Sequence, residues 1–469
     1  MLLQWGAVSR SLRRSGASLL WRSSSGLSVG EPEYSSSDGR RLSMTWVRGL
    51  MDSMARRARL GGSERARVPP LPREALLRLL ASSRDQLSKY SSVVNLRLPP
   101  RSILNVCGDT HGQYFDLLSI LSPDVGDWPS PQNAYLFNGD FVDRGLYSIE
   151  VVLSLLCLKL AEPDAVHLLR GNHETTEMNA VYGFEKQVQD VYGAGSGVLE
   201  SFRDVFDALP LAAVVEDAAL VVHGGLGPVS SGMTLREIAQ LDRFAFDWGA
   251  GAGAGADAGA GTKESSTEGA AISEAFTAIN ELLWADPGKQ TTKRPLSDAG
   301  QTRGFSHNKS RGGGQRFGPD VTHRFLKQNG LGLLVRSHEP RDDGFSVDHD
   351  FTHEQDEERA GEDNHAAAPG VIWAPRRCMT VFSAPNYCDN SGNLGAFVRF
   401  NRWTESAETG PSGPLLDRAG VSVLYGGRLR DSDVEYSVVR FAAVPHPHSS
   451  PVALEILKKQ HETWGRRRR

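Results

Sequence analysis

The sequence predicts an α/β fold, in the layered α+β sense, built from alternating short strands and helices. Short β-rich runs such as Ile103 to Cys107 and Ala134 to Phe137 recur along the chain. Between them lie segments with helical periodicity, such as Tyr147 to Leu160 and Pro319 to Lys327. Several of the β-rich runs end in clusters of glycine and polar residues, which are typical of ligand-bearing loops at strand ends.

Composition indicates a globular protein with additional low-complexity segments. The 469 residues are 39% hydrophobic and 23% charged, and they include 49 Gly and 24 Pro. The longest apolar stretch, Val151 to Leu160, is far shorter than the roughly 20 residues that span a bilayer, so no membrane span is expected. The four cysteines form no CxxC pair, which argues against a disulfide framework or a zinc knuckle.

Charge is distributed unevenly along the chain. The first 70 residues hold twelve Arg and five acidic residues, so their formal net charge is +7, whereas that of the whole chain is −4. The remainder is therefore acidic, at −11. This balance argues against a nucleic-acid-binding body and against nucleic acid as a partner.

The amino-terminal segment has the composition of a targeting sequence. It is rich in Arg and Ser and has no acidic residue before Glu31, while Leu2, Trp5, Val8 and Leu12 recur at helical spacing. These features favour a transit peptide for a mitochondrion or plastid. The alternative is a disordered basic tail on a cytoplasmic or nuclear protein. We expect residues 1–67 as a whole to be a disordered leader.

The main domain is expected at residues 68–457. An apolar stripe that includes Leu76 and Leu80 begins just after Pro69 and Pro70, as at the start of a helix.

Low-complexity insertions interrupt this domain near residues 249–271 and 346–368. The first holds a Gly/Ala run and the second is polar and acid-rich. Residues 458–469 are expected to form a basic tail.

The polar clusters at strand ends carry potential metal ligands. Together they offer two Asp, one Asn and three His as ligands, and one Asp and one His remain for other roles. The clusters are Gly108–Gly112, Gly139–Gly145, Arg170–Glu174, His223–Gly225 and His338. Carboxylates mixed with imidazoles suit a pair of divalent ions such as Mn, Fe or Zn. A single Asp-x-His-Gly tetrapeptide is more often a capped turn, so the prediction depends on the joint occurrence of all the clusters.

These clusters resemble the signature blocks of the metal-dependent phosphoprotein phosphatase family of serine/threonine phosphatases. The blocks are GDTHGQ, GDFVDRG, LLRGNHE, HGG and SAPNYC, and the resemblance runs from about residue 70 to about 457. Within the family the sequence is most similar to the type-five catalytic domain, through RGNHETTEMNAVYGFEKQV, FGPDVTHRFL and AVPHPHSSPVA.

The resemblance implies a central β-sandwich flanked by helices, the calcineurin-like metallophosphoesterase architecture. It also implies hydrolysis of phosphoserine and phosphothreonine by direct attack of a hydroxide that bridges two divalent metal ions, Mn or Fe/Zn. Phosphoproteins are then the expected substrates, and regulatory proteins are candidate partners. A nucleotide-directed metallophosphoesterase and an inactive scaffold are the alternatives.

Carried over residue by residue, the resemblance also implies roles for the side chains. The implied metal ligands are Asp109, His111, Asp140 as the bridge, Asn172, His223 and His338. The implied phosphate-binding residues are Arg144, Arg311, Asn172 and Tyr387. His173 would protonate the leaving oxygen, and Asp143 would orient its imidazole. Arg311 is the least regular of these positions, because a Gly-rich stretch follows it.

Overall fold

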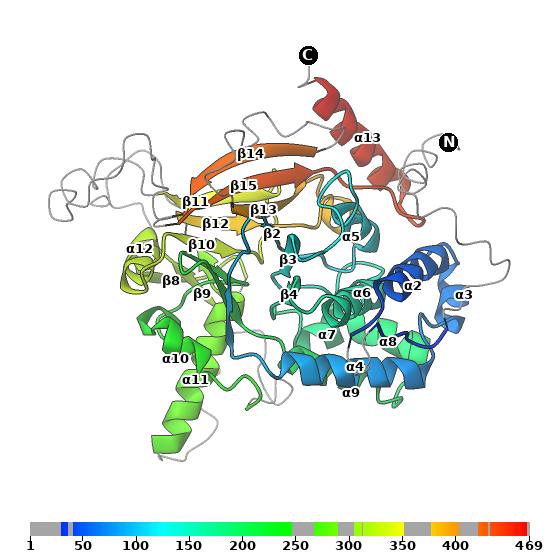
Figure 1. The fold of residues 1–469 in the computed structure, drawn as a ribbon, viewed down its shortest axis with the longest axis horizontal. Helices are drawn as coiled ribbons and strands as arrows, with labels where there is room; N and C mark the ends of the chain where they lie inside the picture. The colour runs from blue at the N-terminus through cyan, green and yellow to red at the C-terminus, as the bar shows by residue number, and fades with distance from the viewer. Residues whose placement is uncertain are drawn as a thin grey trace.

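Two six-stranded sheets form the centre of the molecule (Figure 1). The computed structural model describes residues 30–35, 41–245, 267–288, 304–311, 313–350, 377–402, 421–429 and 432–466. Both sheets contain parallel and antiparallel pairs. Helices flank them, so the predicted layered α/β fold with a central β-sandwich is confirmed.

The first sheet carries the strand order β1-β5-β6-β10-β12-β11. Its strands, in that order, are Val93–Leu96, Ala212–Val215, Ala219–Val222, Leu333–Arg336, Arg377–Val381 and Phe345–Asp350. The second sheet has the order β14-β15-β13-β2-β3-β4. Its strands are Val421–Arg428, Val434–Phe441, Gly395–Arg402, Ile103–Cys107, Asn133–Phe137 and Val166–Leu168. A small third sheet joins β7, β9 and β8, which are Asp286–Pro287, Gln315–Phe317 and Phe305–His307.

Apolar side chains from the facing sides of the two large sheets form one core between them. Alternate residues point to opposite faces of a strand, so Leu104 and Val106 of β2 share this core with Val221 of β6 and Val335 of β10. The intervening residues face outward, toward the helices. The sandwich therefore follows from period-two burial in both sheets.

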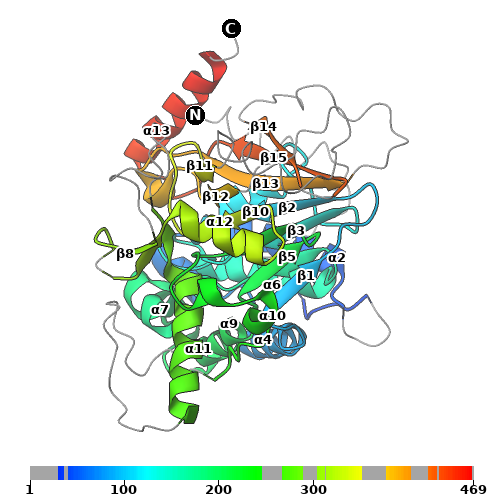
Figure 2. The same ribbon diagram turned by 90° about the vertical axis from the view of Figure 1, so that its left-hand side faces the viewer.

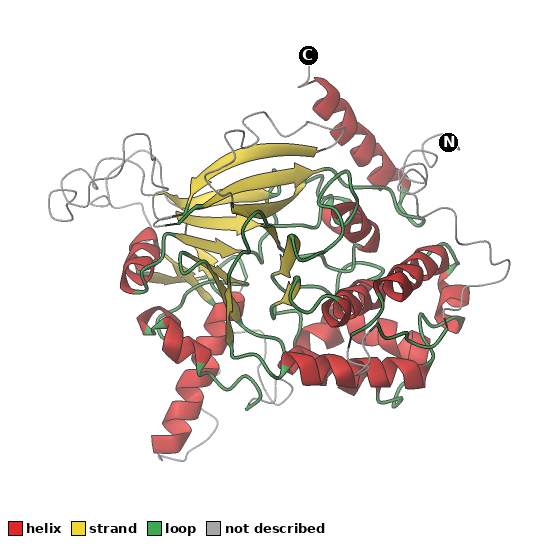
Figure 3. Cartoon of the chain, viewed as in Figure 1, coloured by secondary structure: helices red, strands yellow, loops and turns green. Residues whose placement is uncertain are grey.

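Two helical layers cover the outer faces of the sheets (Figure 3). One apolar core joins the second sheet to α6 and to the helices packed around it, and these helices are α2, α4, α5, α6, α8 and α9, or Met44–Arg57, Arg73–Leu87, Tyr114–Ile120, Ser148–Ala161, Phe184–Tyr192 and Val198–Asp207. On the first sheet lie α10, α11 and α12, which are Leu235–Ala239, Thr267–Trp284 and Pro319–Gln328, and Figure 2 shows α12 across its strands. The shorter helices are α3 (Gly62–Arg67), α7 (Thr176–Tyr182), η2 (Ser230–Gly232) and η3 (Tyr387–Asp389), and α13 (Pro451–Arg466) ends the described chain.

The predicted disordered leader is wrong for residues 41–67. Helix α2 is capped by Ser43, whose hydroxyl accepts the Trp46 amide, and it buries Trp46 and Leu50 in the core. Its last residue, Arg57, forms an ion pair with Glu150 of α6 in which both side chains are 2% exposed. The many arginines of this segment suggested a solvated tail, but this one is neutralised inside the fold.

Three other boundaries also differ from expectation. The acid-rich insertion does not begin at 346, because Phe345–Asp350 forms β11 and pairs antiparallel with β12. Helix α11 already begins at Thr267, within the first predicted insertion. Helix α13 continues past residue 457 to Arg466. The Gly/Ala run, residues 351–368 and all but the last residue of the proposed targeting segment 1–30 lie outside the described residues.

In the described part of the chain, no helix is both long and apolar enough to cross a membrane.

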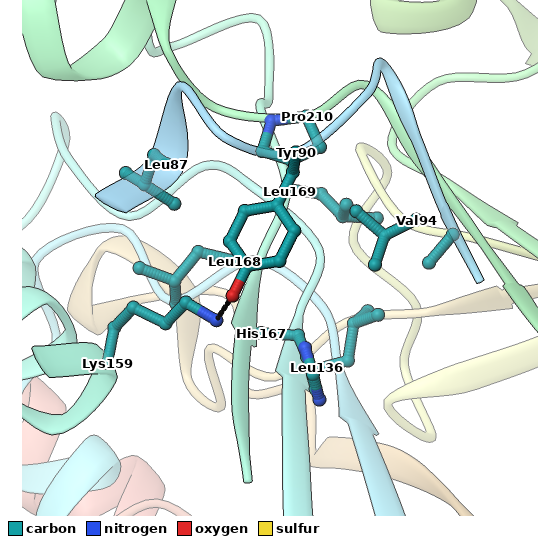
Figure 4. Close-up of a pocket in the computed structure, with 10 residues that line it drawn as sticks. Leu87, Tyr90, Val94, Leu136, Lys159, His167, Leu168, Leu169 and Pro210 are labelled. Atoms are coloured by element: carbon teal, nitrogen blue, oxygen red, sulfur yellow. Dashed lines mark hydrogen bonds between the residues drawn. The ribbon is translucent and has the colours of Figure 1, made fainter. Parts of the chain in front are cut away.

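A small pocket of about 10 Å³ lies between α4, α6 and the sheets (Figure 4). Lys159 lines it, and its Nζ donates to the Tyr90 hydroxyl at 2.9 Å and to the Pro163 carbonyl at 2.7 Å. Burial lowers the pKa of Lys159 to about 8. The volume is about that of one water molecule, so this pocket is too small for a substrate.

Candidate active site

The predicted site residues follow the carboxyl ends of neighbouring strands. Strands β2, β3 and β4 are parallel, and their register places Cys107, Phe137 and Leu168 side by side. The loops after these strands therefore emerge together, and they carry Asp109, His111, Asp140, Asn172 and His173. His223 follows β6, and His338 follows β10, which pairs in parallel with β6.

Tight backbone turns aim these side chains at one point. The site residues His111, Asp140, Asp143, Arg144 and His338 have positive φ angles of 39°, 52°, 68°, 65° and 71°. Non-glycine residues rarely adopt this conformation, and it persists only where the surroundings enforce it. Gly139 precedes Asp140 with φ 83°, and a Cβ there would collide with the backbone of Gly171. The two ligand loops can approach each other only because this position is glycine.

Two buried clusters with metal-binding geometry share one carboxylate. The first consists of His111, Asp140 and His173, and the second of Asp140, His223 and His338. His111 Nε2 lies 3.4 Å from Asp140 Oδ2, and His223 Nε2 lies 3.3 Å from Asp140 Oδ1. This arrangement is consistent with a binuclear metal site bridged by Asp140.

Backbone contacts orient the imidazoles toward the shared carboxylate. His111 Nδ1 lies 3.0 Å from the carbonyl oxygen of Val142, and His223 Nδ1 lies 2.7 Å from that of Asn138. Both Nδ1 atoms therefore donate, which directs each Nε2 toward the cluster. This is the ring orientation that a metal ligand requires.

Two of the predicted ligands, Asp109 and His338, each have a buried polar atom without a hydrogen-bonding partner among the described residues. Asp109 Oδ1 accepts the backbone N–H of His338 at 2.9 Å. The unpartnered atoms are Asp109 Oδ2 and His338 Nε2. The side-chain oxygen of Asn172 lies 3.1 Å from His223 Nε2. Buried polar atoms are rarely left unpaired, so this donor set fits divalent cations.

The charge balance of the cluster also favours cation binding. Burial would raise the pKa of Asp140, but the neighbouring imidazoles, His223 foremost, hold it well below its usual value. Burial also opposes protonation of His111, yet Asp109 and Asp140 raise its pKa to about 9. Burial and the nearby positive charge of Arg311 lower the pKa of His338 well below its usual value. The carboxylates are thus held ionised in a buried site by positive charge on the imidazoles, a charge that bound divalent cations would supply instead.

His173 and Asp143 form a pair at the edge of this cluster. His173 Nδ1 lies 2.8 Å from Asp143 Oδ2, and both side chains are buried. The other Asp143 oxygen accepts the backbone N–H of Phe184 at 2.8 Å. The carboxylate is therefore fixed on both sides, and it sets the orientation of the His173 ring, whose Nε2 remains available.

The predicted phosphate-binding side chains Tyr387, Arg144 and Arg311 each have different contacts. Tyr387 lies against His111, with ring centroids 5.1 Å apart. Arg144 is exposed at the rim, and its guanidinium lies 3.7 Å from the centre of the Tyr182 ring. Arg311 pairs with Asp286 at 2.5 and 3.2 Å and donates to the backbone carbonyl of His338 at 2.8 Å.

Two buried acids with no predicted role support the site. Glu174 accepts the backbone N–H groups of Asp140, Phe141 and Gly171 at 2.8 to 2.9 Å, so it joins the two loops that carry the cluster. Asp286 receives Arg311 and also Arg336, at 2.8 Å. Glu174 lies inside the LLRGNHE block, but its contacts depend on tertiary structure and no sequence signal specifies them.

The fold and the shared-carboxylate site define a class of protein. Residues 104–342 match the model of the calcineurin-like phosphoesterase family, and the chain belongs to this family.

Among individual proteins, the chain is similar to serine/threonine-protein phosphatase 5 of Solanum lycopersicum and of Homo sapiens. It is 33% identical to the first over 425 residues, which are 90% of this chain and 57% of that protein. It is 35% identical to the human protein over 383 residues, 82% of this chain and 57% of that protein. The chain thus spans less than two thirds of the length of these relatives.

A solved structure covers the same region. It is a protein serine/threonine phosphatase from Saccharomyces cerevisiae described as similar to human phosphatase PP5. It has 32% identity and a TM-score of 0.56, and the match covers 82% of this chain and 94% of that one.

Proposed function

We propose that this protein is a metal-dependent serine/threonine phosphatase that hydrolyses phosphoserine and phosphothreonine in proteins. The observation that carries the proposal is the pair of buried clusters sharing Asp140. The similarity to serine/threonine phosphatases over most of the chain supports this choice of substrate class.

Six side chains would hold two metal ions, which we assign as Mn or Fe/Zn. They are Asp109, His111, Asp140, Asn172, His223 and His338. Two divalent ions bound there would supply the positive charge that activates a water molecule as the nucleophile and stabilises the phosphoryl group during attack. The chain itself contributes the ionised carboxylates and the correctly oriented imidazoles described above.

His173 would be the general acid. Its Nδ1 is held by Asp143, so its Nε2 can carry the proton that the leaving serine or threonine oxygen needs. The Asp143 carboxylate also stabilises the protonated ring. We thus assign His173 to proton transfer and not to metal binding, although its ring lies close enough to His111 and Asp140 to share a metal ion with them.

Phosphate binding is assigned to Arg144, Arg311, Tyr387 and the amide of Asn172. Arginine suits this role because its planar guanidinium can donate two parallel hydrogen bonds to phosphate oxygens. Arg144 is exposed at the rim, where it can reach an incoming substrate. Arg311 donates through Nε and Nη2 to Asp286 and to the His338 carbonyl, which leaves its Nη1 for the ligand.

A substrate comparison tests the proposal. The purified full chain, supplied with Mn²⁺, is assayed with a phosphoserine peptide and with a dinucleoside polyphosphate. We expect turnover of the peptide at a kcat/KM at least about tenfold higher. Preferential hydrolysis of the nucleotide would instead identify a nucleotide-directed phosphoesterase, and no turnover of either, with metals bound, would identify an inactive scaffold.

A further inference from the structure

The loop after β12 carries Tyr387 in an unusual backbone conformation. Asn386, Cys388 and Asp389 have φ angles of 44°, 53° and 61°, although none is glycine. Such a run of left-handed residues costs free energy and persists only where other parts of the structure hold it. The position of Tyr387 therefore depends on contacts from outside the loop.

The loop borders a pocket on one side. A pocket of about 230 Å³ is lined on one side by residues of this loop, among them Asn386 and Asp389. Tyr147 and His446 line the same pocket. Open space beside a strained loop gives it room to relax, so individual hydrogen bonds become important for its position.

Several side chains hold the loop, including Gln460, which donates to the carbonyl oxygens of Gly392 and Asn393 on its far side; three contacts lie close to Tyr387. Gln113 Nε2 donates to the Pro385 carbonyl at 2.7 Å before Tyr387, and Asn393 Oδ1 accepts the Tyr387 amide at 2.9 Å. On the pocket side, His446 Nε2 lies 2.9 Å from Asp389 Oδ2. His446 lies 57 residues along the chain from Asp389, in the AVPHPHSSPVA stretch, so this contact ties the carboxy-terminal region to the loop.

The surroundings of His446 define its tautomer and its orientation. Its Nδ1 accepts the backbone N–H of His448 at 3.3 Å, so Nε2 carries the hydrogen and donates to Asp389. Its own backbone N–H donates to the Ser449 hydroxyl at 3.0 Å. Its ring packs edge-on against Tyr147, with centroids 5.8 Å apart. The donor is thus already oriented toward the loop.

We propose that His446 is a positioning residue that acts through Asp389 to hold Tyr387 against the metal-binding cluster. This inference rests on the proposed function, in which Tyr387 contacts the phosphoryl group. Without the His446 contact, the strained turn relaxes toward the pocket and Tyr387 moves away from His111. The metal ligands and the general acid stay in place, so the loss concerns phosphoryl binding and orientation.

The chain offers a matched control and a built-in reporter. His448 also packs on Tyr147, with centroids 6.4 Å apart, but its side chain contacts the Leu60 carbonyl and not the loop. His448→Ala keeps the backbone N–H that His446 Nδ1 accepts. The thiol of Cys388 is exposed and lies in the loop itself, whereas the other three cysteines are buried.

The first experiment measures the rate at which a thiol reagent labels Cys388 in the folded full chain. We expect His446→Ala to change this rate at least about threefold, His446→Gln to restore it, and His448→Ala to leave it unchanged. Glutamine can restore the contact because its amide N–H can reach toward Asp389. Unchanged labelling in His446→Ala, or an equal change in His448→Ala, would overturn the tether. This result does not depend on enzymatic activity, so it stands even if the proposed function fails.

The second experiment measures kcat/KM for a phosphoserine peptide. We expect a loss of about tenfold in His446→Ala, since a displacement of about 1 Å can cost up to about 10²-fold. In a Tyr387→Ala background, His446→Ala should add less than about twofold, because its effect passes through Tyr387. Additive losses would show that His446 acts by another route and would refute its role as a positioning residue for Tyr387.

Discussion

Replacing His173 by Asn separates proton transfer from metal binding. The change removes the imidazole whose Nδ1 lies 2.8 Å from Asp143, while the six proposed ligands remain. Phosphoserine needs a proton on its departing alkoxide, whereas an aryl phosphate releases a phenolate that leaves readily without one. The variant should therefore fail selectively on the phosphoserine peptide.

The expected magnitude follows from how firmly the pair is held. Asp143 is fully buried and is fixed by the Phe184 amide as well as by His173, so the general acid is positioned before substrate binds. A positioned general acid contributes about 10²–10⁴-fold, or roughly 3–5 kcal/mol of barrier. We expect a loss of about 10³-fold in kcat on the peptide and less than about tenfold on p-nitrophenyl phosphate. Asp143→Asn should show the same selectivity with a smaller loss.

The assay compares kcat on both substrates with the metal content of each purified variant. The prediction requires near-normal metal content in His173→Asn. Equal losses on the two substrates, or loss of metal, would refute the reasoning. His173 would then be a ligand, a role that its distance from His111 and Asp140 permits.

Three further predictions concern buried charges outside the reaction itself. Glu150→Ala leaves the buried Arg57 without its carboxylate partner and should lower the free energy of unfolding by about 3–5 kcal/mol, measured by urea titration. A loss below about 1 kcal/mol, as is usual for an exposed ion pair, would contradict this prediction. The buried Lys159 has a pKa of about 8, below the value near 10.4 of an unfolded lysine, so between these pH values the unfolded state binds more protons and stability rises with pH. The stability of the wild type relative to Lys159→Met should therefore increase by about 3 kcal/mol from pH 7.5 to 10.5, and a constant difference would exclude the buried-amine explanation. Glu174→Gln should weaken metal affinity about 10–100-fold in competition titrations, because Glu174 joins the two ligand loops, and unchanged affinity would argue against that function.

The sequence predicted which side chains come together at the candidate site, because these side chains lie directly after strands. Asp109, Asp140 and Asn172 each stand within a few residues of a β-rich run, and neighbouring parallel strands bring such positions together. Short-range patterns were therefore sufficient to place them. The sandwich with flanking helices followed from the same alternation of strands and helices, together with the family resemblance.

Features that depend on tertiary contacts were missed. The amino-terminal helix α2 was taken for a disordered leader because nothing local indicates that Arg57 meets Glu150, 93 residues away. The engagement of Arg311 by Asp286 and the link from His446 to Asp389 also join distant parts of the chain. Strand β11 was read as an insertion because its polar residues belong to an edge strand, where one face and one edge meet solvent.

The most direct test of the central claim is the metal content of the purified full chain together with that of Asp140→Asn. Asp140 is proposed to bridge both ions, so we expect about two divalent metal ions in the wild type and a clear reduction in the variant. Phosphoserine peptide turnover should fall with the metal and return in part when metal is added in excess. A wild type that keeps full phosphatase activity after complete metal removal, or an Asp140→Asn variant with unchanged metal content, would contradict a binuclear site built on this carboxylate.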